Sequence, residues 1–266
     1  MDLRLSFNGD AAGYDRFRPT YADELFADVI RFSGLDENKR ALEIGIGTGQ
    51  ATLPFLRTGC SVVAVEIGDK LARFSREKFA EFRNLEVINR DFESVRLDQG
   101  SFDLVYSASA FHWIPRETGL PKVHGLLKSG GAFAWFSNRP VPAQEDACMR
   151  EALQEVYGRY GRFFAASAPA AADPRTRQRQ AEAKRSERAE TLRQYGFVDV
   201  TGKFYYGTRT FGAEDYVALL GTYSDHKAMP EENRLPFLKE IAAAVDRCGG
   251  KLMVSDNMLL CLGRKP

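Results

Sequence analysis

The sequence predicts an α/β fold with a mainly parallel sheet, helices on both faces of the sheet and a helical cap. Three observations predict it. Apolar strand-like runs alternate with helix-like stretches through the first 139 residues, a glycine-rich turn joins the first run to a helix, and two more strand-like runs follow near the end. Such alternation is typical of parallel strands joined by right-handed crossovers. The 266 residues are enough for one such domain and its cap.

The individual elements follow from hydrophobic spacing and from helix start and stop signals. A first helix is expected to begin at a Thr20 cap and to end at Gly34, because its apolar residues recur at helical spacing. The other helices of this part are expected at about 48–57, 70–79 and 116–127, and the strands at 40–45, 61–66, 85–89, 102–107, 132–137, 197–206 and 251–263.

Three segments are expected from the change in composition along the chain. Residues 1–139 form the core of the sheet together with an N-terminal lid segment, and residues 140–195 form a helical insertion. Residues 196–266 add the last strands, with a second helical insertion at about 212–248. We expect both insertions to pack as a lid over the edge where the parallel strands end.

The stretch 175–193 is dense in arginine, with glutamates placed between the arginines. Opposite charges three or four residues apart on a helix can pair, so a solvated helix is the favoured interpretation. A nucleic-acid-binding patch is the alternative, but the stretch lacks the interleaved aromatic residues that are typical of single-strand binders.

Charge and cysteine content narrow the function. A formal net charge of +1 argues against general attraction to nucleic acid or to a membrane surface. Cys60, Cys148, Cys248 and Cys261 lack C-x-x-C spacing, so we expect reduced thiols and no zinc site. The start of the chain lacks a signal-like pattern, and no apolar run approaches about 18 residues. A cytoplasmic protein is therefore expected.

The turn after the first strand predicts a nucleoside site. In Glu43-Ile44-Gly45-Ile46-Gly47-Thr48-Gly49 the glycines stand at every second position, where they let a ligand approach the backbone. A dinucleotide fold would show G-x-G-x-x-G with a pyrophosphate at the helix start. Here the spacing differs, and Glu43 would repel a phosphate. A carboxylate suits S-adenosylmethionine, which carries an ammonium and a sulfonium and no phosphate.

Two more acids follow the next two strands. Glu66 ends the run that begins at Ser61, and Asp91 follows the run 85–89. Because the carboxyl ends of parallel strands line the ligand crevice, these acids should meet the glycine turn. Glu66 is expected to accept from both ribose hydroxyls and Asp91 from the adenine amino group, with Ile67 or Phe92 against the ring.

Six segments in this order resemble a known family. They are Tyr14–Tyr21, Glu43–Gly49, Val65–Glu66, Arg90–Glu93, Ser101–Ser107 and Leu126–Gly131. Together they are similar to the class I S-adenosylmethionine-dependent methyltransferases, in the methyltransferase type 11-like small-molecule branch with the ubiquinone/menaquinone C-methyltransferases and trans-aconitate methyltransferase. The likeness covers residues 10–137 well and 190–264 more loosely. Ser129 departs from it, because the family usually has proline before the two glycines.

The resemblance implies a Rossmann-like seven-stranded, mostly parallel sheet whose last strand is antiparallel. It also implies S-adenosyl-L-methionine as cofactor, S-adenosyl-L-homocysteine as product, and no metal. The segment around Tyr14 should fold over the cofactor, and the backbone of 107–110 should approach its methionine part. The expected cofactor-binding residues are Glu43, Gly45, Ile46, Gly47, Thr48, Gly49, Glu66, Ile67, Asp91, Phe92, Ser107, Ala108, Tyr14 and Arg18.

The acceptor side is expected after the fourth strand. His112 is the candidate general base, because an imidazole titrates near neutral pH. The alternative is a histidine that only orients its loop. The residues expected to border the acceptor are Tyr21, Trp113, Tyr223 and His226.

The expected function is methyl transfer from S-adenosylmethionine to an oxygen, nitrogen or carbon atom of a small-molecule metabolite (EC 2.1.1.-), by a monomer or homodimer that binds neither nucleic acid nor membrane. Two alternatives stay open. One is a non-catalytic subunit that binds adenosylmethionine or adenosylhomocysteine. The other is an NAD(P)-dependent oxidoreductase, which the glycine spacing and Glu43 disfavour.

Overall fold

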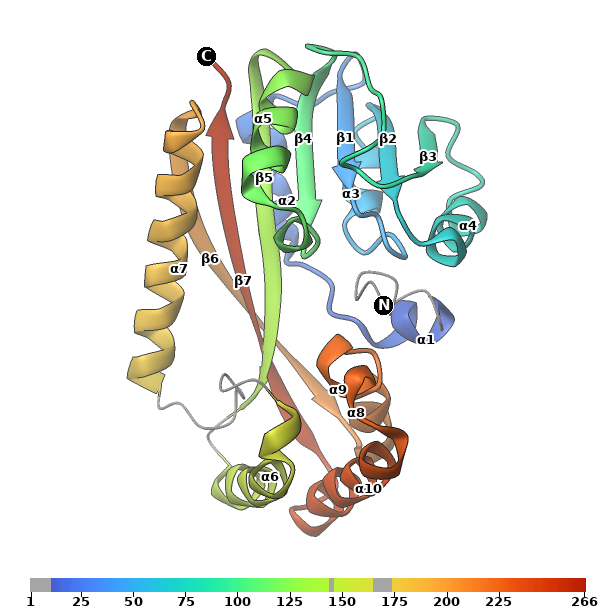
Figure 1. Ribbon diagram of the computed structural model, residues 1–266, viewed down its shortest axis with the longest axis vertical. Coiled ribbons are helices and arrows are strands. Elements are labelled where there is room, and N and C mark those ends of the chain that lie inside the picture. The colour runs from blue at the N-terminus through green and yellow to red at the C-terminus, as the bar shows by residue number, and fades with distance from the viewer. Residues whose placement is uncertain (1–10, 144–145, 165–173) are drawn as a thin grey trace.

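One sheet in the order β3-β2-β1-β4-β5-β7-β6 forms the frame of the molecule, as seen in a computed structural model that describes residues 11–143, 146–164 and 174–266 (Figure 1). Strands β1 to β5 are parallel, β7 runs antiparallel to β5, and β6 runs antiparallel to β7. The strands are β1 (Arg40–Ile44), β2 (Ser61–Glu66), β3 (Leu85–Asn89), β4 (Phe102–Ala108), β5 (Leu127–Pro142), β6 (Val198–Phe211) and β7 (Leu252–Arg264). The predicted sheet and its antiparallel last strand are therefore confirmed.

Helices cover both faces of this sheet. The helices are α1 (Ala11–Phe17), α2 (Asp23–Ser33), α3 (Thr52–Leu56), α4 (Asp69–Lys78), α5 (Arg116–Leu126), α6 (Ala147–Arg159), α7 (Pro174–Gln194), α8 (Ala213–Leu220), α9 (Ser224–Ala228) and α10 (Glu231–Arg247). Phe26 of α2 and Phe55 of α3 lie in the apolar core on one face. Leu120 of α5 and Leu192 of α7 lie in the core on the other face.

The first predicted helix has the predicted end but a different start. Gly34 follows α2 with φ at 62°, a left-handed conformation that glycine adopts without steric cost. The N-cap is Ala22 and not Thr20, and it makes no side-chain capping bond. The Thr20 cap is therefore wrong, because the chain between α1 and α2 stays extended for two residues longer than the hydrophobic spacing indicates.

Strands β5 and β6 are longer than predicted, whereas β7 is as long as predicted. β4 pairs with β5 only as far as Phe136, whereas β5 continues to pair with β7 up to Pro142. The extended ends of β5, β6 and β7 reach past the parallel strands to the cap helices (Figure 1). Helices α6, α8 and α10 share a third apolar core there, with Phe237 and Ile241 fully buried at its centre.

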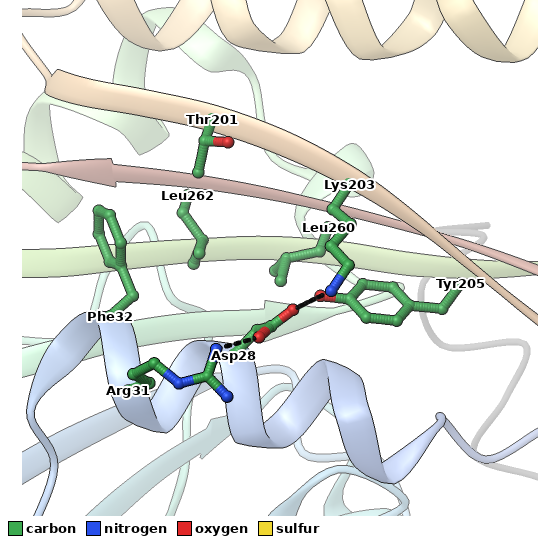
Figure 2. A pocket seen from close by; sticks show the side chains of 8 residues that line it. All are labelled: Asp28, Arg31, Phe32, Thr201, Lys203, Tyr205, Leu260 and Leu262. Atoms are coloured by element: carbon green, nitrogen blue, oxygen red, sulfur yellow. Dashed lines mark hydrogen bonds and ion pairs between the residues drawn. The ribbon is translucent and has the colours of Figure 1, made fainter.

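A small cavity of about 260 Å³ lies between α2 and strands β6 and β7 (Figure 2). The Asp28 carboxylate in it accepts hydrogen bonds from Lys203 Nζ at 2.6 Å, from Tyr205 and from Arg31 Nη1 at 2.7 Å. The bonds from Lys203 and Tyr205 lower the pKa of Asp28 to about 2. These polar groups hydrogen-bond to one another, so the cluster ties α2 to β6.

Cys148 and Cys248 form a disulfide, with Cα atoms 5.7 Å apart, so the prediction of reduced thiols is wrong for this pair. Cys60 and Cys261 are free and buried. Sequence spacing gave no sign of the bond, because the two residues are 100 positions apart. The cap brings the start of α6 beside the end of α10.

The disulfide is expected to stabilise the protein. Closing a loop of about 100 residues should contribute roughly 2–5 kcal/mol to the free energy of unfolding, because it restricts the unfolded chain. The double variant Cys148→Ser, Cys248→Ser should lose this amount in urea unfolding. Dithiothreitol should have the same effect on the wild type and none on the variant. Four titratable thiols in the denatured, unreduced wild type would contradict the bond.

Candidate functional site

A cavity of about 1510 Å³ lies at the carboxyl ends of the parallel strands. Its walls come from the turn after β1, the ends of β2 and β4, the segment around α1, one side of α7, and residues 223–225 at the start of α9. The extended parts of β5 and β7 complete it. Parts of the chain from residue 14 to residue 259 therefore meet around one space.

The three glycines after β1 have different tasks. All are left-handed, with φ of 76° at Gly45, 57° at Gly47 and 82° at Gly49. A Cβ on Gly45 would lie 2.5 Å from Ala110, and one on Gly49 would lie 2.2 Å from the Phe79 ring, so both positions are required for packing. A Cβ on Gly47 would meet no described atom closer than 3.9 Å. Because Gly47 lines the cavity, its missing side chain leaves room for a ligand against the backbone.

Glu43 is a buried carboxyl at the end of β1, with 1% of its surface exposed. Its Oε2 accepts hydrogen bonds from Thr52 Oγ1 at 2.7 Å and from the Tyr106 hydroxyl at 2.9 Å. Burial raises the pKa of Glu43 to about 7 despite these bonds. Its other oxygen receives no hydrogen bond from the described residues. A cation in the cavity beside Glu43 would favour the charged form.

Glu66 ends β2 and is also buried, with 6% of its surface exposed. Its Oε2 accepts from the Gly47 amide at 2.9 Å, and its Oε1 accepts from the Gly68 amide at 2.8 Å. Burial raises the pKa of Glu66, while these amide bonds act in the opposite direction. A carboxylate oxygen can accept two hydrogen bonds, so each still has capacity for a ligand hydroxyl.

The residues after β2 and β3 lie beside Glu66. Asn89 Nδ2 donates to the carbonyl oxygens of Glu66 at 2.8 Å and of Ile67 at 3.1 Å, which fixes the turn after β2. Ile67, Asp91 and Phe92 all line the cavity. The acids that follow β1, β2 and β3 therefore open onto one space, as do Ile46 of the glycine turn and Ala108 at the end of β4.

The segment that includes α1 closes one side of the cavity. Arg18 lies between two aromatic rings, 4.6 Å from the centroid of Tyr14 and 4.8 Å from that of Tyr223. Its Nη2 donates to the Thr222 carbonyl at 2.8 Å. Tyr14, Arg18 and Tyr223 line the cavity, so this cation joins the N-terminal segment to the cap.

Tyr21 joins the same segment to the loop after β4. Its hydroxyl lies 2.8 Å from Ser109 Oγ, which also accepts from the Asn138 amide at 3.2 Å. Ser109 has φ at 54°, which is uncommon for a residue with a side chain and concentrates at functional sites. The part played by the Ser109 side chain was not predicted. A serine in a loop carries no sequence signal for a left-handed backbone.

His112 lies in a short 3-10 turn after β4 and lines the cavity, with its ring 4.9 Å from that of Trp113. His112 is an exposed residue, although the protein atoms around its ring remove part of its hydration. This desolvation, together with the charges of Arg188 and Lys184, lowers the pKa of His112 to about 4. The premise that the imidazole titrates near neutral pH therefore does not hold here, and the neutral ring is a weak proton acceptor.

Three residues predicted at the cofactor do not line the cavity. Thr48 is fully buried, and its Oγ1 accepts a hydrogen bond from Gln50. Gly49 packs beneath Phe79, as described above. Ser107 is also fully buried and donates to the Ile44 carbonyl at 2.9 Å. These three residues support the glycine turn and the strand ends through contacts inside the protein, away from the cavity.

His226, predicted at the acceptor, lies inside the cap and not at the cavity wall. Only 4% of it is exposed, and its Nδ1 lies 2.7 Å from Asp225 Oδ1. Its Nε2 lies 3.2 Å from the Tyr157 hydroxyl, and the Phe237 ring packs against it. The cap buries this face of α9, so His226 has a packing role.

Helix α7 forms a wall of the cavity, so the predicted solvated helix is exposed on one side only. The expected ion pairs exist, for example Lys184–Glu187 at 2.9 Å. However, only 6% of Arg188 is exposed, because this side of α7 packs on β6 and β7 with Leu192 fully buried. Arg188 precedes Leu192 by four residues, and residues four apart lie on the same side of a helix, so Arg188 shares the buried side of Leu192.

The described residues lack both a metal-binding cluster and a membrane-spanning helix. In that part of the chain no group of three or more His, Cys, Asp or Glu side chains is placed to hold a metal ion. Within the same ranges, none of the helices combines the length and the apolar character needed to cross a bilayer.

Comparison with known proteins gives consistent results. A family model described as a methyltransferase domain matches residues 42–135. The uncharacterized methyltransferase Mb3374 of Mycobacterium bovis is 30% identical over 160 residues, which are 60% of this chain and 62% of that protein. The match therefore spans less than two thirds of that relative's length.

Solved structures share the fold. A structure from Anaeromyxobacter dehalogenans assigned as a type II methyltransferase superposes with a TM-score of 0.64 at 20% identity, over 93% of this chain and 98% of that one. Haemonchus contortus phosphoethanolamine N-methyltransferase 2 in complex with S-adenosyl-L-methionine has a TM-score of 0.55 at 13% identity, over 97% of this chain and 57% of that one.

Gly47 and Gly100 form a matched pair for testing the site. Both are left-handed, with φ of 57° and 61°, and neither has a neighbour in the way of a Cβ. Alanine at either position should cost about 1–2 kcal/mol of stability. Only Gly47→Ala should also weaken S-adenosylmethionine binding in calorimetry, by at least tenfold, because only Gly47 lines the cavity. Equal affinity of the two variants would refute a backbone contact there.

Proposed function

We propose that this chain, which belongs to the class I S-adenosylmethionine-dependent methyltransferases, transfers the cofactor's methyl group to an oxygen, nitrogen or carbon atom of a small molecule. One observation carries the proposal. The Glu66 carboxylate accepts a hydrogen bond from Gly47, and both residues open onto the same cavity as Glu43 and His112. A ligand beside the acids would therefore share one cavity with a second ligand beside His112.

The residues present fit the chemistry of S-adenosylmethionine. Glu66 has acceptor capacity left for the two ribose hydroxyls. Glu43 offers a buried carboxylate oxygen to the ammonium or sulfonium, and Gly47 allows close approach to the backbone. A phosphate-bearing dinucleotide fits less well, since its charge would lie beside two buried carboxyls.

When bound, the cofactor supplies a methyl group on a positively charged sulfur that is already an excellent leaving group. The chain's own task is to hold and orient the acceptor and to exclude water. Correct orientation can contribute on the order of 7–11 kcal/mol in the best cases. The Tyr21–Ser109 hydrogen bond fixes the loop after β4 against the N-terminal segment. Arg18 fixes that segment against the cap.

The cavity supports a small-molecule acceptor. Its volume of about 1510 Å³ exceeds the roughly 300–1,000 Å³ of common ligand pockets, which leaves room for a nucleoside cofactor and a second small molecule. His112 faces this space as a neutral imidazole. Because its pKa lies well below neutral, the ring is suited to accept a hydrogen bond from the acceptor more than to remove a proton.

Label transfer tests the proposed reaction. Purified protein mixed with cell extract and S-adenosylmethionine labelled at the methyl group should yield a labelled small molecule in mass spectrometry. Glu66→Ala should lose most of this transfer, because losing a buried acceptor weakens cofactor binding by roughly 1–3 kcal/mol. Glu86→Ala, an exposed carboxylate on neighbouring β3, is the control and should behave as wild type. Tight cofactor binding without any labelled product would point to a non-catalytic binder.

Cofactor affinity is expected to depend on pH through Glu43. Its pKa of about 7 means that the ligand-free carboxyl is largely protonated at mildly acidic pH. A cationic ligand favours the carboxylate, so binding should release a proton and tighten as pH rises from about 6 to about 8. Glu43→Gln should bind more weakly and lose this dependence. Calorimetry in two buffers of different ionisation enthalpy measures the proton release, and no release at pH near 6.5 would contradict the assignment.

The same raised pKa sets the pH dependence of ligand-free stability. The folded protein holds a proton that the unfolded chain releases at lower pH, so the contribution of Glu43 to stability is lost as pH rises from about 4.5 to about 7. Glu43→Gln should flatten that part of the stability profile.

A further inference from the structure

One side of helix α7 presents positive charge to the cavity. Arg177, Ala181, Lys184 and Arg188 are spaced four, three and four residues apart, so they share one side of the helix. All four line the cavity. The three cations of this stripe are what an approaching acceptor meets on this wall.

Arg188 is the buried member of the stripe. It is 6% exposed, and neither its Nε nor its Nη1 has a hydrogen-bond partner among the described residues. Arg177 Nε is likewise buried without a partner in that part of the chain. A buried guanidinium left unpaired is costly, because it loses its hydration and gains no bond in return. The buried Arg188 guanidinium and the buried Nε of Arg177 lie on one cavity wall and point to an absent acceptor of hydrogen bonds.

The ion pairs of Glu187 and Glu182 on α7 are made with cations other than Arg188. Glu187, its neighbour in sequence, forms ion pairs with Arg116 and Lys184. Glu182 lines the cavity but pairs with Arg185 at 2.7 Å. The helix therefore satisfies its outer charges and leaves the inner guanidinium without an anion.

The position of Arg188 is set by packing. Its guanidinium carbon lies 4.6 Å from the centroid of the Trp135 ring, which is itself 4% exposed. A guanidinium over an indole ring is attracted by the π-electrons and is held in a defined plane. His112 lies near enough for the charge of Arg188 to lower its pKa. The N–H donors of Arg188 are therefore held in a fixed orientation near the loop that carries His112.

From this geometry we infer that the methyl acceptor is an anion whose carboxylate or phosphate group is held by the Arg188 guanidinium, with Arg177 and Lys184 beside it. A planar guanidinium can bind either group through two parallel hydrogen bonds. This rests on the proposed methyltransferase function and adds to it the chemical class of the acceptor. Arg188 is a binding residue for the acceptor in this assignment.

Anion binding to the intact protein tests the inference directly. Protein saturated with S-adenosylhomocysteine is titrated with malonate, and separately with inorganic phosphate, at constant ionic strength set by chloride. Wild type should bind at least one of the two in calorimetry, and Arg188→Gln should weaken that binding by at least tenfold. Arg188→Lys, which keeps the charge but not the fork, should lie between them. Malonate alone binding would identify a carboxylate site, and tighter phosphate binding a phosphate site.

Arg193→Gln is the matched control. It removes the same charge from the same helix, but Arg193 is exposed, pairs with Glu190 and lies outside the cavity. Its anion affinity should equal that of wild type. An equal loss of anion affinity in both variants would show that only net charge matters and would overturn the inference. No binding of either anion would overturn it as well.

Binding of S-adenosylhomocysteine and label transfer are measured in the same preparation. If they are intact while the anions fail to bind, only the acceptor class is wrong, whereas their failure would overturn the proposed function itself.

A second measurement uses the wild type alone, in case the Arg188 variants fold poorly. An anion bound among these cations should raise the pKa of His112 from about 4 toward its usual range, because it offsets their repulsion. The imidazole signal in an NMR titration reports this, and its absence in His112→Asn assigns it. No change in the titration of His112 at saturating anion would place the anion elsewhere.

Discussion

The strands of the sheet differ in length, and this difference gives the cap helices their place. β4 ends its pairing at Phe136, whereas β5 and β7 stay paired as far as Pro142 and Val254. The backbone groups of this extension can be satisfied only within the antiparallel strands β5, β7 and β6. The paired ends of β5, β7 and β6 therefore extend beyond the parallel strands as one antiparallel arm. The cap helices bury their apolar faces at its end, and residues of both the arm and the parallel strand ends line the cavity (Figure 1).

This arrangement separates charges of opposite sign within one space. Glu43, Glu66 and Asp91 lie at or just after the ends of β1, β2 and β3 on one half of the sheet, because parallel strands all end at the same edge. The cations of α7 come from the other half, where α7 packs against β6 and β7. Helix α7 also pairs several of its cations with its own acids, for example Lys184 with Glu187 and Arg185 with Glu182. The topology alone thus makes a cavity with an acidic and a basic wall.

The sequence was informative where structure is local. The strands β1, β2 and β3 and the glycine turn were predictable, because apolar runs, glycine spacing and terminal acids act over a few residues. The Cys148–Cys248 bond was not, since it depends on how two insertions 100 residues apart pack. Arg188 was hidden for a related reason. An arginine in a charged helix looks solvated until the position of Leu192 shows which side of the helix is buried.

His112 lines the same cavity as the acids and the α7 cations, and its protonation depends on these surroundings. Without ligands, desolvation and the charges of Arg188 and Lys184 keep it neutral. Under the inferred acceptor class, the acceptor itself would bring the missing negative charge and would make the imidazole a stronger base as it binds. The opposite applies at Glu43, where the positive cofactor would favour the ionised carboxyl. Buried groups that are unfavourable in the ligand-free protein would thus be stabilised by the two ligands they serve, which is the pattern expected when perturbed groups cluster at a functional site.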